Sequence, residues 1–150
     1  MIKTILLFVS FALSGCGVRA PIAQYHASQL TASTPDAISL VVEFNISNTN
    51  DEPIHLLQYK YLVTVNNSTV YHGLAQSQRT LPRWSTVAAT IPVVIPREYL
   101  LATNDLSWRL SGSLEYVASG ALAETLLDSR LWKPSASIGA SDSFVIPPAE

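Results

Sequence analysis

Apolar and polar residues alternate along much of the chain with the period of two that is typical of a β-strand with one buried face. The clearest run covers residues 38–46, where the apolar positions are Ile38, Leu40, Val42, Phe44 and Ile46. Similar runs predict strands over residues 54–65, 69–76, 87–95, 106–116 and, with a weaker pattern, 135–146. Roughly six or seven strands with one or two short helices predict a mainly β fold, an antiparallel β-sandwich of the immunoglobulin or fibronectin type III kind.

Turn-forming residues separate these runs. The polar segment 48–53 ends the first strand, and Asn66-Asn67 suits a tight hairpin because Asn tolerates a positive φ. A two-residue loop at 66–67 or at 67–68 would place Val70 and Leu74 beside the strand face that carries Tyr59, Tyr61 and Val63, and the register between these two loops stays open.

Prolines and helix formers complete the predicted layout. Pro92 lies inside the run 87–95, so that strand is expected at a sheet edge or with a bulge. One or two helical turns are expected over residues 97–101, directly after Pro96. The composition of residues 121–130 favours a helix.

The first fifteen residues have the pattern of a secretory leader. Lys3 supplies a positive charge, and the apolar run that ends at Leu13 is too short to cross a bilayer of about 30 Å. The next residues, Ser14 and Gly15, are small and precede Cys16, the only cysteine of the chain. A lone cysteine cannot form an intramolecular disulfide, so the fold is expected to depend on packing.

The four residues Leu13-Ser14-Gly15-Cys16 resemble the bacterial lipobox, the site at which lipoprotein precursors are processed. The resemblance implies that residues 1–15 are a lipoprotein signal peptide and that Cys16 carries a diacylglycerol and an N-acyl chain. It also implies that Gly17, in place of Asp, directs the product to the periplasmic face of the outer membrane if the source is Gram-negative. Two or more acyl chains anchor a protein stably where one is marginal.

The domain boundaries follow from this anchor and from the strand pattern. Residues 16–36 are rich in small polar residues and are expected to form the lipidated N-terminus and a flexible tether, with a short strand near residues 22–25 as an option. Residues 37–146 are expected to form the sandwich, and residues 147–150 a C-terminal tail.

Charge bears mainly on the partners. The chain has nine Lys and Arg against eleven Asp and Glu, a formal net charge of −2, and the basic residues form no stripe. A slightly acidic chain without a basic patch has no electrostatic surface for nucleic acid. The membrane, through the lipid anchor, is the partner that the sequence predicts, and an envelope protein or lipid is the expected second partner.

No catalytic, cofactor-binding or metal site is predicted from the residues. The histidines have no metal-ligand spacing; they are His26, His55 and His72. Ser111-Gly112-Ser113 is not a nucleophile elbow, and Glu115, Glu124 and Asp128 do not form an acid pair. Trp84 and Trp132 lie near predicted loops, where core packing or loop anchoring is favoured over a binding role.

The order of features between residues 40 and 95 resembles the WHy domain of the LEA-2 (late embryogenesis abundant, LEA14-like) family. The features are the strand Val42–Ser47, the turn Asn48-Thr49-Asn50, Tyr61, the turn Asn66-Asn67, Gly73, Leu81-Pro82 and the strand Val87–Ile95. Thr49 and Asn67 depart from the family pattern, which has Pro and Gly at these positions. The resemblance implies an immunoglobulin-like or fibronectin-like sandwich without enzymatic activity.

Together these patterns predict a non-enzymatic, membrane-anchored lipoprotein. It would bind or protect a component of the cell envelope, with a role in stress or desiccation tolerance. The alternative is an accessory structural lipoprotein of an envelope secretion or transport complex.

Overall fold

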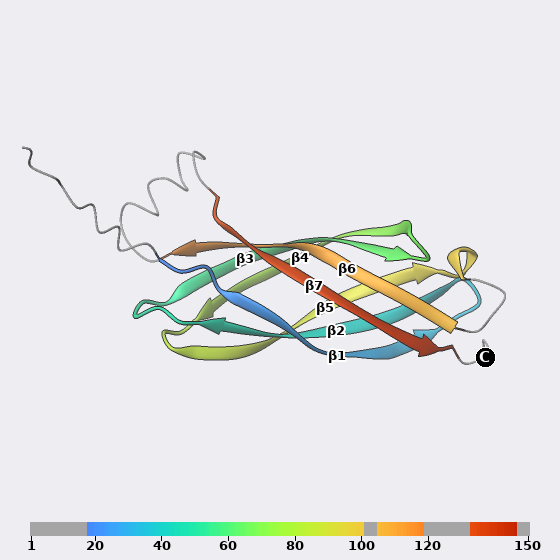
Figure 1. Cartoon of the computed structure of the whole chain (residues 1–150), viewed down its shortest axis with the longest axis horizontal. Coiled ribbons are helices and arrows are strands. Elements are labelled where there is room, and N and C mark those ends of the chain that lie inside the picture. The colour runs from blue at the N-terminus through green and yellow to red at the C-terminus, as the bar shows by residue number, and fades with distance from the viewer. Residues whose placement is uncertain (1–17, 101–104, 119–132, 147–150) are drawn as a thin grey trace, which may run out of the picture.

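The computed structural model describes residues 18–100, 105–118 and 133–146, which form two antiparallel sheets packed face to face (Figure 1). The elements are β1 (Ile22–Ser33), β2 (Ala37–Asn48), β3 (Ile54–Val65), β4 (Ser68–Leu81), β5 (Ser85–Pro96), the 3₁₀ turn η1 (Arg97–Tyr99), β6 (Asp105–Ala118) and β7 (Ser135–Val145). One sheet has the order β1-β2-β5 and the other β4-β3-β6-β7. The predicted mainly β sandwich is therefore confirmed.

The core lies between the two sheets and follows the period-two pattern of the sequence. On β2 every second residue is almost completely buried, from Ile38 to Ile46. The opposite sheet contributes Val63 from β3 and both Trp108 and Leu110 from β6. Because the strands of a sheet alternate their side chains between its faces, these residues meet in one apolar layer.

β5 confirms the expectation for the proline-containing run. It pairs with β2 over its whole length and lies at an edge of its sheet. Pro92 is paired in register with Val41 and occupies this edge strand, where a missing N–H removes no hydrogen bond within the sheet.

The prediction of a flexible tether over residues 16–36 is wrong for most of its length. Residues Ile22–Ser33 form β1, a twelve-residue strand that pairs with β2. Its alternation is weak in the sequence because β1 is an edge strand that is only half-buried, and register shifts occur after Tyr25 and after Leu30. Partial burial needs few large apolar residues, so small and polar residues suffice here.

The predicted facing of the β3–β4 hairpin is also wrong. The loop is Asn66-Asn67, both with positive φ, and Val65 is paired with Ser68. A bulge then follows, because Thr64 pairs with Thr69 whereas Val63 pairs with Tyr71. The extra residue reverses the facing of the rest of β4, so Leu74 is 61% exposed.

The same bulge places Gly73 opposite Tyr61. A Cβ at Gly73 would lie 2.0 Å from Tyr61 Cζ, so only glycine leaves room for the phenol ring. The Tyr61 hydroxyl donates a hydrogen bond to the carbonyl of Pro92 on β5 and so joins the two sheets. Burial, with the neighbouring Tyr71, raises the pKa of Tyr61 to about 12, which keeps this donor protonated.

Regular alternation along residues 54–65 predicts that Leu57 and Tyr59 lie on one face, and this prediction is wrong. A second bulge lies between Leu56 and Gln58 on β3, and it interrupts the pairing with both β4 and β6. Ile54 and Leu56 point into the core before the bulge, and Tyr59 does so after it. The bulge therefore resets the alternation.

The turn after β2 is held together by the side chain of Asn48, which is only 2% exposed. Its Nδ2 donates to the carbonyls of Glu52 (2.8 Å), Pro82 (3.1 Å) and Leu81 (3.3 Å). Its Oδ1 accepts from the backbone N–H of Asn50 (2.9 Å) and from Asn50 Nδ2 (2.8 Å). One buried amide thus joins the β2–β3 turn to the end of β4.

Asn50 extends this cluster to the segment before β1. Its Oδ1 accepts a hydrogen bond from the backbone N–H of Arg19 (2.8 Å), and its Nδ2 donates to the Arg19 carbonyl (2.9 Å). This two-way bond fixes the chain at Arg19, so the described polypeptide is tied to the sandwich from its first residues.

Other predicted elements have different outcomes. The helical turn after Pro96 is confirmed as η1. The predicted signal peptide 1–15, the helix 121–130 and the tail 147–150 lie outside the described residues. None of the helices in the described part of the chain is long and apolar enough to cross a membrane.

Candidate functional site

The described residues place the predicted candidates far apart rather than in one site. His26, His55 and His72 are exposed on β1, β3 and β4, and His55 Nδ1 is hydrogen-bonded to Thr80 Oγ1 (2.9 Å). No group of three or more His, Cys, Asp or Glu side chains among the described residues could hold a metal ion. The lipobox residues Leu13, Ser14, Gly15 and Cys16, together with Trp132, Glu124 and Asp128, lie outside the described part of the chain.

Glu115 has a structural partner that the sequence did not indicate. It is 8% exposed on β6 and forms an ion pair with Lys60 of β3. Gln58 Nε2 donates to its second carboxylate oxygen (2.6 Å), and Gln76 Nε2 of β4 donates to Gln58 Oε1 (3.2 Å). The hydrogen bond from Lys60 lowers the pKa of Glu115 despite its burial, so this carboxylate is a weak base.

Asp142 on β7 makes the contact between the edges of the two sheets. Its Oδ2 accepts hydrogen bonds from Ser28 Oγ (2.6 Å) and from Tyr25 Oη (2.7 Å), both on β1. The bond from Ser28, followed by that from Tyr25, lowers the pKa of Asp142. A serine beside such a weakly basic carboxylate is not activated for nucleophilic attack. The cluster instead connects β7 of one sheet to β1 of the other.

The outer face of β6 and β7 carries a regular array of small hydroxyls. We call it the serine face; its members are Ser107, Ser111, Ser113, Ser135, Ser137, Ser141 and Ser143. The register pairs Ser107 with Ser143 and Ser113 with Ser137, which places them side by side on one surface. Such a surface offers many hydrogen-bond donors and acceptors and little apolar area.

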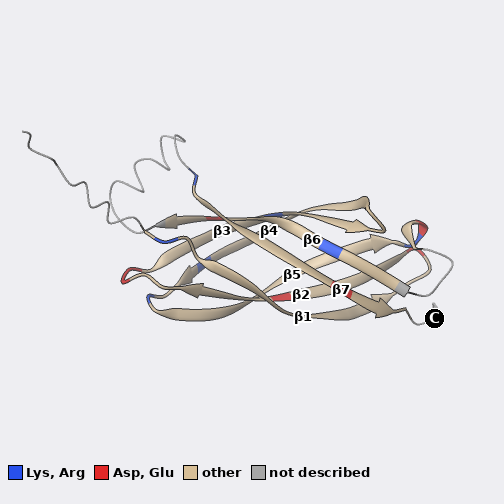
Figure 2. Cartoon of the chain, viewed as in Figure 1, with Lys and Arg blue, Asp and Glu red and all other residues tan. Residues whose placement is uncertain are grey.

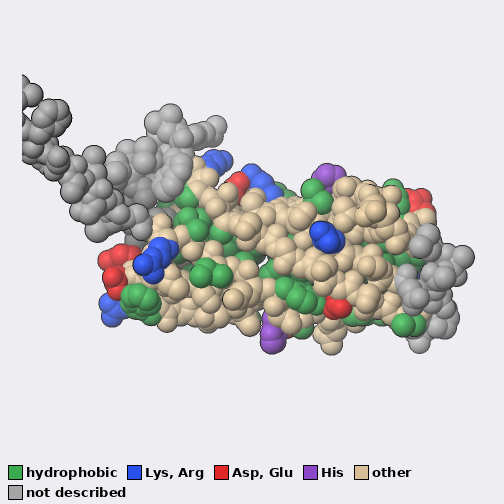
Figure 3. All heavy atoms as spheres, viewed as in Figure 1, with side chains coloured by type: hydrophobic (Ala, Val, Ile, Leu, Met, Phe, Trp, Pro, Cys, Tyr) green, Lys and Arg blue, Asp and Glu red, His purple; other side chains and the backbone are tan. Residues whose placement is uncertain are grey.

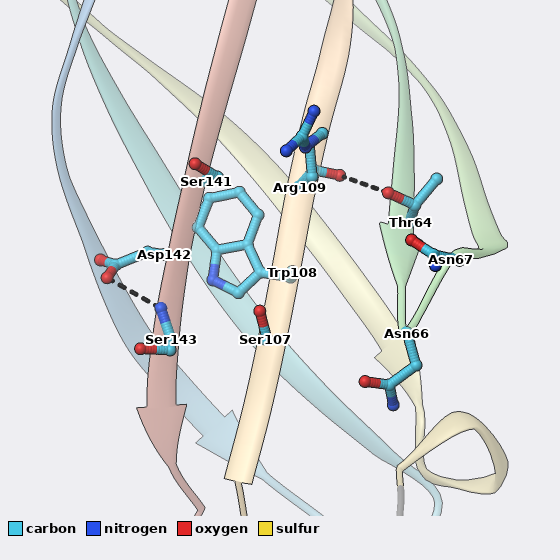
Figure 4. Close-up of a pocket in the computed structure, with 9 residues that line it drawn as sticks. All are labelled: Thr64, Asn66, Asn67, Ser107, Trp108, Arg109, Ser141, Asp142 and Ser143. Atoms are coloured by element: carbon cyan, nitrogen blue, oxygen red, sulfur yellow. Dashed lines mark hydrogen bonds between the residues drawn. The ribbon is translucent and has the colours of Figure 1, made fainter.

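Arg109 is the one cationic side chain that β6 and β7 contribute within the described residues, and it is paired in register with Ser141. Figure 2 shows a single basic position on β6, and Figure 3 shows an isolated basic side chain at the same place, surrounded by polar surface. An open groove of about 600 Å³ adjoins it, lined by the hairpin loop Asn66-Asn67 and by Ser141 and Ser143 (Figure 4). A second groove, of about 480 Å³, also includes Arg109 and Ser141.

Trp108 lies at the floor of the first groove. Its ring is 2% exposed, and its indole Nε1–H is buried without a hydrogen-bond partner among the described residues. The residue is paired in register with Asp142, so both belong to the inner face of the sheet (Figure 4). The groove is therefore polar at its rim, where Arg109 and the serines can bind a ligand, and closed by the core beneath.

Arg109 and the serine face together are suited to binding an anionic group. A guanidinium offers a planar set of N–H donors that matches a carboxylate or phosphate, and flanking hydroxyls can complete the coordination of such a group. The signal was present in the sequence as alternating small polar residues in 107–113 and 135–143, where every second position is Ser except Arg109 and Gly139. Only the pairing of β6 with β7 shows that they share a face with Arg109.

Comparisons with known proteins agree with the fold. No protein-family model matches the sequence, and no curated protein is significantly similar to it. Among solved structures, the Arabidopsis thaliana protein AT1g01470 has a TM-score of 0.67 and 14% identity, over 99% of this chain and 95% of that one. A protein described as late embryogenesis abundant (LEA), At2g46140.1, has a TM-score of 0.65 and 14% identity, over 87% of this chain and 73% of that one.

The chain has a LEA-2-like fold. A protein from Archaeoglobus fulgidus has a similar structure, with a TM-score of 0.55 and 13% identity over 87% of this chain and 98% of that one. At these identities the likeness concerns the fold. The features that carried the LEA-2 resemblance have structural roles here: Asn48 and Asn50 form the turn cluster, and Tyr61 packs on Gly73.

Proposed function

We propose that this protein is a non-enzymatic lipoprotein whose LEA-2-like domain is held at a membrane of the cell envelope through acylated Cys16. The lipobox sequence Leu13-Ser14-Gly15-Cys16 supports the anchor. Gly17 supports the periplasmic face of the outer membrane in a Gram-negative cell. The proposed lipids on Cys16 are a diacylglycerol and an N-acyl chain.

The domain then acts as a binding module for an envelope component that carries an anionic group. The observation that carries this proposal is the isolated Arg109 within the serine face, at the point where two grooves meet. The partner is a polar molecule or surface with carboxylate or phosphate groups, because the serine face offers hydroxyls and one guanidinium.

The anchor is tested by replacing Cys16 with serine. The wild-type protein should incorporate labelled palmitate and sediment with membranes, whereas C16S should do neither, because a serine hydroxyl does not replace the thiolate that accepts the lipid. If C16S still incorporated palmitate and remained in the membrane fraction, the anchor would be refuted.

The binding face is tested by photo-crosslinking in intact cells. A photoreactive amino acid at Ser141, on the serine face, should yield a discrete crosslinked product, and R109Q should remove it. The matched control is the same amino acid at Thr90, an exposed position on β5 in the other sheet. Equal products from both positions, or a product unaffected by R109Q, would contradict the proposed face.

The identity of the product separates two functions. Crosslinks to one protein in a constant ratio would favour the alternative role, an accessory component of an envelope secretion or transport complex. Crosslinks to lipid or polymer would favour protection of the envelope itself. For a role in desiccation tolerance, the purified protein should preserve the activity of a test enzyme through drying, and loss of that activity would count against this role.

A further inference from the structure

We propose that the end of the sandwich formed by the β2–β3 and β4–β5 turns docks on the bilayer, with the exposed Trp84 in the lipid headgroup layer. The domain then stands upright on the membrane, with its strands running away from the bilayer. This inference rests on the proposed acylation of Cys16. It adds an orientation, and a second membrane contact, to an anchor that by itself would fix only the position of one residue.

The short distance between Cys16 and the folded domain is the first step. Arg19 is fixed by its two hydrogen bonds with Asn50, and it lies three residues after Cys16. An extended chain covers at most about 3.6 Å per residue, so Cys16 lies within about 11 Å of this point. A lipid on Cys16 therefore brings the β2–β3 turn to the membrane surface.

Trp84 lies at the same end, in the turn between β4 and β5 (Figure 1). The turn belongs to the Asn48 cluster, since Asn48 Nδ2 donates to the carbonyls of Leu81 and Pro82. Trp84 Nε1 donates to Asp51 Oδ1 (2.9 Å) in the β2–β3 turn. The ring is thus held directly beside the turn that binds Arg19.

The conformation of Trp84 is unusual for a residue without a role in the core. Its φ is +50°, a region that costs an L-residue about 1–2 kcal/mol, and its side chain is 64% exposed. Strain of this kind persists where the surroundings impose it and is common at functional sites. An indole that is apolar on its faces and hydrogen-bonded at its N–H suits the membrane interface, where Trp is enriched.

The rest of this end is compatible with a bilayer surface. Val18 is 39% exposed and Ile22 is 50% exposed, so apolar side chains accompany the indole. Among the described residues near this end, the positive charges of Arg19, Arg83 and Lys133 nearly balance the negative charges of Asp51 and Glu52. The contact is therefore expected with zwitterionic lipids and does not depend on a strongly anionic surface.

The opposite end provides an internal control. Strands of about twelve residues are about 40 Å long, and η1 lies at the far end of the sandwich (Figure 1). Tyr99 of η1 is 37% exposed. In a domain that stands on the membrane, a tryptophan at position 99 is remote from the lipids, whereas Trp84 is in contact with them.

The experiment uses the acylated full-length protein in phosphatidylethanolamine–phosphatidylcholine vesicles whose acyl chains are brominated near the headgroup, since bromine quenches indole fluorescence on contact. All variants carry W132F, so the emission comes from Trp84 and from the buried Trp108. Brominated lipid should quench the W132F protein, W84F should remove the quenched share, and W84F/Y99W should not restore it. Circular dichroism of each variant verifies that the sandwich is folded.

The outcomes separate this inference from the function on which it rests. Mass spectrometry of the N-terminal peptide first establishes whether Cys16 carries lipid, and its absence would refute the anchor and the docking together. In acylated, vesicle-bound protein, an unquenched Trp84 would refute the docking alone and leave this end to a protein partner. Equal quenching of tryptophans at positions 84 and 99 would also refute it, because the domain would then lie on its side.

Discussion

Replacement of Asn48 by alanine should be among the most damaging single changes outside the apolar core. The side chain is 2% exposed, and five hydrogen bonds of 2.8–3.3 Å connect it to the turns around it. Alanine leaves two of these partners without an obvious substitute, the buried carbonyl of Leu81 and the backbone N–H of Asn50. The Pro82 carbonyl loses less, since it keeps a bond from Ser85 Oγ (2.7 Å).

The magnitude follows from the two groups that lose their partner. Each buried polar group left without a hydrogen bond costs about 1–3 kcal/mol, so the free energy of unfolding should fall by about 2–6 kcal/mol. N48D should be at least as harmful, because a carboxylate can still accept from Asn50 but cannot donate to the carbonyls of Leu81, Pro82 and Glu52.

The measurement is equilibrium unfolding in urea of residues 16–150 carrying C16S, which lacks the proposed acylation site. N48A should lower the transition midpoint with little change in the m-value. N45A is the matched control: Asn45 lies on the same strand and alternates with the buried Phe44 and Ile46, so its loss should cost about 0.5 kcal/mol or less. The reasoning would be refuted if N48A and N45A had equal effects.

Two further predictions concern packing and pH. G73A should lower the free energy of unfolding by about 1–3 kcal/mol, because the new Cβ would lie 2.0 Å from Tyr61 Cζ. The control G139A should be nearly neutral, because the nearest atom to its new Cβ is 3.8 Å away. Equal decreases in the urea midpoint of the two variants would contradict this. Folding lowers the pKa of Glu115 below its ordinary value of 4.5 and the pKa of Asp142 below its ordinary value of 3.8. Each carboxylate therefore stabilises the fold at a pH above its ordinary pKa, and this stability is lost as the pH falls below that value. For the partly buried Asp142, which water still reaches, the contribution should be less than about 1 kcal/mol. The urea midpoint of a D142N variant should therefore decline less between pH 5 and pH 3 than that of the wild type. An unchanged decline would contradict this.

The sequence by itself determined the fold class and most of the strands. Most residues on the buried face of a sheet are apolar, and their neighbours in sequence need not be, so β2 and β5 could be located from alternation alone. The hairpin loop could be placed to within one residue, at 66–67 or at 67–68, because Asn66 and Asn67 are suited to the positive φ that both adopt. These features depend on interactions that are local or repeat regularly along the chain.

The tertiary structure decided what depends on pairing between strands. Most of β1 was missed because none of its twelve side chains is fully buried, so this strand needs no strong apolar pattern. The bulge after Thr69 reversed the facing of β4, since one unpaired residue changes the face of every residue that follows it. No local pattern marks such a bulge.

The candidate surfaces were decided in the same way. Arg109 and Ser141 are 32 positions apart, and only the register of β6 and β7 places them side by side. Asp142 meets Tyr25 and Ser28 only because β1 and β7 are edges of opposite sheets. Composition and local pattern thus predicted a membrane-anchored sandwich. The attachment of Arg19 to the β2–β3 turn, and the surfaces that the domain presents, follow instead from contacts between residues remote in sequence.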